Sequence, residues 1–236
     1  MKRTIDVCFS PDLIDSYELE GKIVVIVDIL RATSCMVSGF ANGVKGIIPV
    51  ATLEECKEYQ KNGFICAAER GGKQVDGFEL DNSPFSYMNE KLKEKTICAT
   101  TTNGTLAISK SINAEKVIIG AFLNLSAIAL YLENQPNDVI IHCAGWKGKV
   151  NMEDSLFAGA LIEKLLHSHD LNCDASHMAL TYYQGVKNKL LSTVQNSAHA
   201  KRLVKIGINK DIEFCLEIDR FNVIPVLTGK TLMKME

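Results

Sequence analysis

Short apolar runs recur along the first two thirds of the chain, and most are separated by segments of helical length. The clearest run covers residues 24–27, four β-branched side chains in a row, which is typical of a strand buried on both faces. Strands that alternate with helices predict an α/β fold, a three-layer α/β/α arrangement around a largely parallel or mixed sheet. The other expected strands are 46–50, 64–67, 96–99, 116–119 and 139–142, and the expected helices are 34–42, 52–62, 105–111 and 125–133.

The pattern becomes mostly helical from about residue 160. Residues 158–168 and 182–207 have helical patterns, and a short closing strand is expected at 223–227. Pro225 predicts an edge position for that strand, because proline cannot donate to a ladder of hydrogen bonds. No linker rich in Pro, Gly or Ser interrupts the chain. We therefore expect one domain over residues 1–236, with a helical C-terminal portion.

Composition narrows the classes of function. The chain has 236 residues, a net charge of -2 and no basic cluster, which argues against a nucleic-acid partner. The N-terminal sequence lacks the apolar core of a signal peptide, and no apolar run is long enough to cross a bilayer. We therefore expect a cytoplasmic protein with no membrane partner. The eight cysteines form no CxxC pair and show no metal-ligand spacing, so neither disulfides nor a zinc site is expected.

The stretch VVIVDILRATSC combines a buried strand with an unusual set of polar residues. The strand ends on Asp28, and Arg31, Thr33 and Ser34 follow at once. Thr33 or Ser34 can N-cap the next helix and leave its free N–H groups facing an anion, for which Arg31 would be a bidentate partner. The alternative is a plain helix cap with an Asp–Arg salt bridge.

Two further polar loops follow expected strands. Glu69 and Arg70 precede two glycines, which permit close approach of the backbone to a ligand, although an exposed hairpin turn has the same pattern. The loop TTTNGT, residues 100–105, offers hydroxyl and amide donors to phosphate or sulfonate oxygens. It is not a P-loop, because the lysine and the spacing of that motif are missing.

A fourth stretch, residues 143–154, runs from a strand through a glycine loop to Glu153 and Asp154 at a helix start. The helix dipole alone favours acidic residues there. With Asp28 and Glu69, however, they supply the oxygen ligands that Mg²⁺ prefers. Because open α/β sheets bind ligands at the carboxyl ends of their strands, we expect the four stretches to lie together.

The sequence also contains a weak internal repeat. When residues 24–51 are laid over 95–122, Asn42 matches Asn113 and Lys45 matches Lys116. An internal duplication would place the loops 28–34 and 100–105 at equivalent positions. Chance similarity between two strand–helix–strand units is the alternative.

These motifs together resemble the 2-phosphosulfolactate phosphatase family. The resemblance rests on VVIVDILRAT, AERGGKQVDGFELDNSP, TTTNGT and CAGWKGKVNMEDSLFAGAL, which occur in family order from about residue 22 to 165. It implies Mg²⁺-dependent hydrolysis of the phosphate monoester of 2-phospho-3-sulfolactate, a small anionic phosphorylated substrate. Sulfolactate is a precursor of coenzyme M, but family members also occur outside that pathway. One departure is Val150–Asn151, where many relatives have Phe-Ser before the acidic pair.

The resemblance also implies roles for the matching polar residues, Asn82 among them. Arg31 is expected to bind the phosphate, and Arg70 with residues 101–104 the sulfonate. Another 2-phospho acid as substrate, a phospho-aspartate at Asp28, a non-catalytic binding module and a homodimer all remain open. The expected Mg²⁺ ligands are Asp28, Glu69, Glu153 and Asp154. The expected catalytic residues are Asp28, Arg31, Glu69 and Asp154. The expected substrate-binding residues are Thr33, Ser34, Arg70, Gly71, Thr101, Thr102, Asn103 and Gly104.

Overall fold

The computed structural model describes residues 2–236 and contains an 11-stranded sheet with helices on both faces, so the predicted α/β/α class is confirmed. The strand order is β5-β4-β6-β3-β11-β10-β7-β2-β8-β1-β9. The strands are β1 Arg3–Cys8, β2 Ile23–Val27, β3 Gly46–Pro49, β4 Ile65–Arg70, β5 Lys73–Gln74, β6 Thr96–Thr100, β7 Lys116–Gly120, β8 Val139–Cys143, β9 His169–Leu171, β10 Pro225–Thr228 and β11 Thr231–Lys234.

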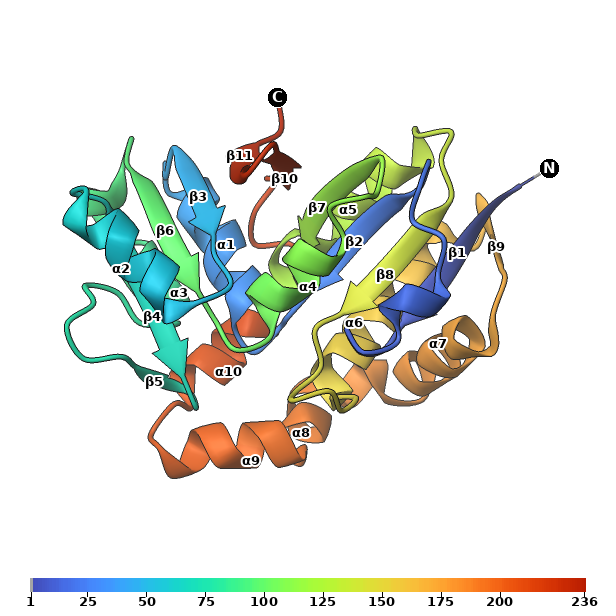
Figure 1. Ribbon diagram of the computed structural model, residues 1–236. Coiled ribbons are helices and arrows are strands. Elements are labelled where there is room, and N and C mark those ends of the chain that lie inside the picture. Colours follow the sequence, from blue (N-terminus) through green and yellow to red (C-terminus); the bar gives the residue numbers. More distant parts are fainter. Residues whose placement is uncertain (1) are drawn as a thin grey trace.

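The helices expected at 34–42, 52–62, 105–111 and 125–133 are confirmed to within two residues by α1, α2, α4 and α5, and the segment after residue 160 is mostly helical. The sequence did not predict β1, β9, β11 or α10. In Figure 1, α4 lies in front of the sheet and α6 lies behind it, so both faces are covered. The α-helices are α1 Ala32–Ala41, α2 Leu53–Lys61, α3 Pro84–Tyr87, α4 Gly104–Lys110, α5 Leu125–Glu133, α6 Met152–Leu165, α7 Asp174–Val186, α8 Leu190–Gln195, α9 Ala198–Lys205 and α10 Lys210–Cys215.

The sheet consists of two parallel groups joined by an antiparallel hairpin. Strands β4, β6 and β3 form one group, and β7, β2, β8, β1 and β9 form the other. The hairpin β10–β11 pairs with each group at a single position, Val226 with Ile118 and Leu232 with Ile47. Figure 1 shows the arrowheads of β4, β6, β2 and β8 directed toward the same side of the molecule, where α9 crosses. Loops from both groups therefore meet there.

The two segments of the weak repeat have the same topology. The unit β2–α1–β3 starts in one parallel group and ends in the other, and β6–α4–β7 makes the reverse crossing. The loops after β2 and β6 lie in contact. Gly104 is so close to Asp28 that a Cβ added to the glycine would lie 2.9 Å from Asp28 Oδ2. This arrangement is compatible with both the internal duplication and the chance similarity of two strand–helix–strand units, so the duplication stays a prediction.

The prediction of an edge position for Pro225 was wrong. Strand β10 lies inside the sheet, between β11 and β7. Pro225 is tolerated because it is the first residue of the strand, and β7 pairs with β10 only at Val226.

The main core surrounds the sheet, and all five residues of β2 are buried. A second, smaller apolar cluster lies under α2 and contains Cys56, Cys66 and Cys98. Within residues 2–236, every helix is too short or too polar to serve as a membrane-spanning segment.

Candidate active site

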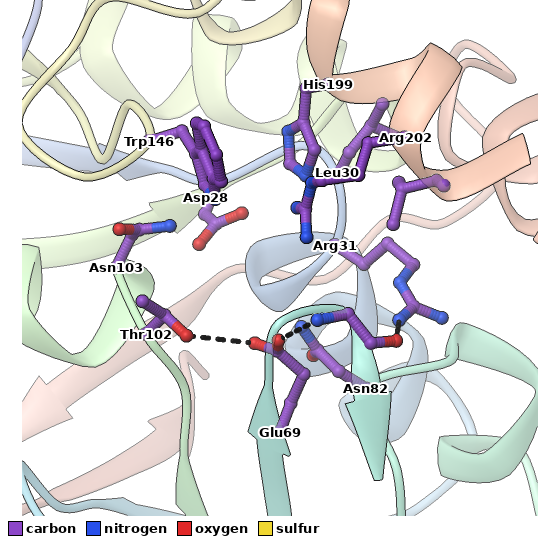
Figure 2. A pocket seen from close by; sticks show the side chains of 12 residues that line it. Asp28, Leu30, Arg31, Glu69, Asn82, Thr102, Asn103, Trp146, His199 and Arg202 are labelled. Carbon is purple, nitrogen blue, oxygen red and sulfur yellow. Dashed lines mark hydrogen bonds between the residues drawn. The ribbon is translucent and has the colours of Figure 1, made fainter. Parts of the chain in front are cut away.

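A polar pocket lies where the loops of the two strand groups meet (Figure 2). Its volume is ≈ 320 Å³ when the space open to solvent at its mouth is counted. The four predicted stretches all contribute to its wall, and α9 adds a part that the sequence did not indicate. The lining residues are Asp28, Leu30, Arg31, Glu69, Gly72, Asn82, Thr102, Asn103, Trp146, His199, Arg202 and Leu203.

Asp28 is held at the pocket by the turn that follows β2. Its backbone N–H donates to Thr33 Oγ1 at 3.0 Å, and the N–H of Thr33 donates back to the Asp28 carbonyl at 3.0 Å. The residue is only 5% exposed. Burial raises the pKa of Asp28 to about 6; the nearby His199 opposes this rise and the charge of Glu69 adds to it. A fraction of Asp28 is therefore protonated just below neutral pH.

Thr33 and Ser34 do not reach the pocket. The prediction that one of them N-caps the helix was wrong, because α1 already begins at Ala32 and Arg31 is the N-cap. Both side chains are fully buried, and Ser34 Oγ donates to the carbonyl of Ile29 at 2.8 Å. They shape the turn that presents Asp28, and as placed they cannot contact a substrate.

Arg31 lines the pocket but has two protein partners. Its Nη1 donates to Asp211 Oδ2 at 2.5 Å, and its Nη2 donates to the carbonyl of Gly72 at 2.9 Å. The salt bridge between Arg31 and Asp28 that the sequence suggested as an alternative was wrong, because the carboxylate that pairs with Arg31 is Asp211 on α10. Arg31 thus ties the start of α1 to α10 and to the β4–β5 hairpin.

Glu69 and Arg70 lie on opposite faces of β4, because the strand extends through both residues. Glu69 faces the pocket, where Oε1 accepts from the N–H of Gly72 and Oε2 accepts from Thr102 Oγ1 at 3.5 Å. Arg70 donates to the carbonyl of Glu69 and to Thr100 Oγ1, and it does not line the pocket. Gly71 and Gly72 form the left-handed turn of the β4–β5 hairpin. The turn is not the exposed one of the alternative, because Glu69 and Gly72 are buried and line the pocket.

In the loop after β6, some polar side chains stabilise the loop itself and others line the pocket. Thr101 Oγ1 accepts from the N–H of Thr105 at 3.2 Å, so it holds the start of α4 and does not line the pocket. Thr102 and Asn103 are on the pocket wall, and Asn103 Oδ1 accepts from the N–H of Lys147 at 3.2 Å. Gly104 packs so closely that a Cβ there would lie 2.7 Å from the Cβ of Ala32.

Asp154 joins two of the site loops from a fully buried position. Its Oδ1 accepts from the N–H of Ile29 at 2.9 Å, and its Oδ2 accepts from the N–H of Gly145 and from Asn151 Nδ2. Burial, with the charge of Asp28, raises the pKa of Asp154 well above its usual value. The residue is not brought to the pocket wall; it fixes the loops after β2 and β8 relative to each other.

Glu153 is also fully buried and pairs with a histidine of the pocket. Its Oε1 lies 2.6 Å from His199 Nδ1, whereas its Oε2 is buried without a hydrogen-bond partner. The ring of His199 stacks on Trp146 at a centroid distance of 6.3 Å. Glu153 therefore fixes the orientation of an imidazole that lines the pocket.

Arg202 is the second guanidinium of the pocket, and Figure 2 shows it extending toward Asp28. Its guanidinium carbon lies 4.8 Å from the centroid of the Trp146 ring, and its Nε is buried without a partner. Among the described residues no carboxylate forms a salt bridge with it, so its charge is available to an anion.

Sequence reasoning missed Trp146, His199 and Arg202. The signal for two of them was present, because His199 and Arg202 in the string HAKRL are three residues apart and hence share a helix face. Nothing in the local sequence of α9, however, indicates that this face would cover the pocket. That placement depends on long-range packing.

The donor atoms on the wall fit Mg²⁺. Asp28 and Glu69 offer carboxylate oxygens, and Asn82 Oδ1, on the same wall, is buried with no partner. Within residues 2–236, no three carboxylate or imidazole groups converge within 4.8 Å. Mg²⁺ usually keeps several waters and takes only one or two carboxylates plus substrate oxygens, so such a preformed cluster is not required. Glu153 and Asp154 already have other partners.

We expect Gly104→Ala to displace Asp28. The added methyl group would meet Ala32 and the Asp28 carboxylate inside normal contact distance, which should cost about 1–3 kcal/mol of folding free energy. Misplacing a reacting group by about 1 Å lowers turnover by about a hundredfold. Steady-state kinetics would measure the loss. Gly185→Ala is the matched control, since nothing lies within 4 Å of that site; an equal loss in both variants would contradict the role given to Gly104.

Comparisons with known proteins agree on one family. The family model described as 2-phosphosulpholactate phosphatase matches residues 8–230. A protein of Thermotoga maritima named probable 2-phosphosulfolactate phosphatase is 42% identical over 218 residues, covering 92% of this chain and 94% of its own length. A protein of the same name from Caldanaerobacter subterraneus is 42% identical, over 91% of this chain and 91% of its own length. Another, from Clostridium beijerinckii, is 36% identical, over 94% of this chain and 95% of its own length.

Proposed function

Because the chain belongs to the 2-phosphosulpholactate phosphatase family, we propose that it is a Mg²⁺-dependent phosphatase that converts 2-phospho-3-sulfolactate to sulfolactate and phosphate. The observation that carries the proposal is the pocket itself. It places two carboxylates, Asp28 and Glu69, opposite a free guanidinium, Arg202. Such a site suits a ligand that carries several negative charges and a metal ion.

Asp28 and Glu69 would hold Mg²⁺, with the Asn82 carbonyl oxygen as a further donor. When bound, the ion would offset negative charge on the phosphoryl oxygens. Of the groups on the wall, His199 is best placed to transfer a proton, because Glu153 holds its Nδ1 and leaves Nε2 free for the leaving oxygen. The carboxylate of Asp28 would either activate the attacking water or attack phosphorus itself.

The sulfonate is assigned to Arg202, in place of Arg70. A sulfonate is a permanently charged and weakly basic anion, so a guanidinium can bind it without help from the metal. Arg202 lines the pocket, and its Nε lacks a partner. Arg70, in contrast, points to the other face of β4 and donates to Thr100.

We expect Arg202→Ala to raise KM for phosphosulfolactate by about tenfold to a hundredfold, the cost of losing a charged hydrogen bond. The rise for phospholactate, which lacks the sulfonate, should be much smaller. Steady-state kinetics on both substrates would measure it, with Arg70→Ala as the matched control. A larger and sulfonate-selective effect of Arg70→Ala would return the role to that residue.

The substrate itself is tested by a panel of phosphosulfolactate, phospholactate and phosphoglycolate. The proposal predicts the highest kcat/KM for phosphosulfolactate. A preference for another member would keep the phosphatase and change its substrate. Binding of all three without release of phosphate would show that the pocket belongs to a non-catalytic module.

A further inference from the structure

Three cysteines that are far apart in the sequence meet under α2. Cys56 lies on α2, Cys66 on β4 and Cys98 on β6, and all three are fully buried. Their sulfur atoms lie within 4.8 Å of one another, and the Cys56 and Cys98 sulfurs are 3.7 Å apart. The spacing along the sequence gave no sign of this cluster, because it depends on the pairing of β4 with β6.

The surroundings of the three thiols are apolar. Ala68 and Phe78 complete the buried cluster, and Tyr59 and Phe64 pack against it. No carboxylate oxygen or imidazole nitrogen of residues 2–236 joins the three sulfurs as a fourth ligand. Burial raises the pKa of the Cys66 thiol to about 12, whereas the hydrogen bond with Cys98 lowers the pKa of the Cys56 thiol. Because the surroundings are apolar, a ligand that left net charge on the three sulfurs would be disfavoured here.

Charge balance selects among the ions that prefer sulfur. Three thiolates leave one negative charge on Zn²⁺, which also prefers a fourth ligand, and two on Cu⁺. A trivalent ion leaves none. Trivalent arsenic forms three bonds to sulfur and needs no further ligand, so its product with three cysteines is neutral and suits an apolar cluster.

We propose that Cys56, Cys66 and Cys98 form a binding site for trivalent arsenic, supplied as arsenite. In the step, As(OH)₃ reacts with three thiols to give As(S–Cys)₃ and three waters. Three As–O bonds break and three As–S bonds form, and each thiol proton leaves on a water molecule. No atom changes its oxidation state, so neither an oxidant nor a reductant is needed.

Access to the cluster requires opening of α2. This helix lies on the outside of β4 and β6, and Cys56 is its only buried residue. A short exposed helix of this kind can open locally without global unfolding. We therefore expect slow binding that becomes faster at low concentrations of urea, below those that unfold the protein.

The test uses the full chain, reduced and kept free of oxygen, with sodium arsenite as the probe. Intact mass spectrometry should show one arsenic atom per chain with the loss of three hydrogens. Alkylation in a denaturant should modify all eight cysteines of the arsenite-free chain but leave Cys56, Cys66 and Cys98 of the complex unmodified, and this mapping needs no variant. Cys66→Ala and Cys98→Ala should each weaken binding by about a hundredfold, the order expected when one arm of a multivalent contact is lost.

Cys173→Ala is the matched control, because this half-buried cysteine is the N-cap of α7 and follows β9, at the edge of the sheet opposite β4; the variant should bind arsenite as the wild type does. Absence of bound arsenic in the wild type would overturn the proposal. So would protection of only two cysteines, or unchanged binding by Cys66→Ala. Tighter retention of Zn²⁺ than of arsenite would refute the argument from charge.

Discussion

Replacing Asp28 with Asn should abolish phosphate release and, at about pH 8, make the folded protein more stable. The amide keeps the shape of the side chain but loses the charge that would hold Mg²⁺. We expect turnover to fall by at least about a thousandfold, or roughly 4 kcal/mol of transition-state stabilisation. Phosphate release at saturating Mg²⁺ measures this loss. Turnover within about tenfold of wild type would remove Asp28 from the site.

The gain in stability follows from the raised pKa of Asp28. The value changes from 3.8 to about 6 on folding, so the folded state binds more protons between these pH values. The contribution of protonated Asp28 to the free energy of unfolding is fully present below pH 3.8 and is lost as the pH rises through about 6. Above that pH the wild type holds a buried charge, whereas the Asn variant does not.

The expected gain for Asp28→Asn is therefore at most about 3 kcal/mol at about pH 8 and close to zero at about pH 4. Urea unfolding without Mg²⁺ at the two pH values measures it. Asp76→Asn is the control, because Asp76 is exposed and should change stability at neither pH. A variant that is less stable than wild type at about pH 8 would contradict the burial argument.

Arg31→Met should destabilise the fold by about 3–5 kcal/mol, the usual cost of leaving one partner of a buried ion pair alone. Arg31 is 3% exposed, and its removal leaves Asp211 and the carbonyl of Gly72 without their donor. Urea unfolding measures the change. The double variant with Asp211→Leu should be less destabilised than the sum of the two single variants.

Lys61→Met is the matched control for the Arg31 experiment. Lys61 and Glu58 form an exposed pair, which should contribute less than about 1 kcal/mol. If Arg31→Met changed stability no more than Lys61→Met, the structural role of Arg31 would be wrong. Its charge would then be free to bind phosphate, as the sequence alone suggested.

Local sequence patterns predicted most elements because their determinants are local. The β-branched run of β2 and the alternation of strands and helices require only periodicity and burial. The prediction of an edge position for Pro225 was wrong because that position depends on contacts distant in the sequence. The β10–β11 hairpin inserts between two parallel groups through single paired positions, and no residue within the hairpin encodes that insertion.

The same distinction applies to the site. Asp28, Glu69, Thr102 and Asn103 were predicted from loops at strand ends, and all four line the pocket. Arg70, the last residue of β4, and Asp154, in the first turn of α6, were predicted in the same way but point elsewhere. Strand alternation and backbone hydrogen bonds decide their direction. The wall formed by α9 could not be predicted, because its packing over the pocket involves contacts distant in sequence.

The proposed metal-dependent phosphatase is tested most directly by phosphate release from phosphosulfolactate before and after removal of Mg²⁺ by a chelator. Activity should disappear with the ion, return when Mg²⁺ is added back, and not return in the Asp28→Asn variant. Full activity of the metal-free protein, or rescue of the Asp28→Asn variant by Mg²⁺, would contradict the proposed role of Asp28 and the ion.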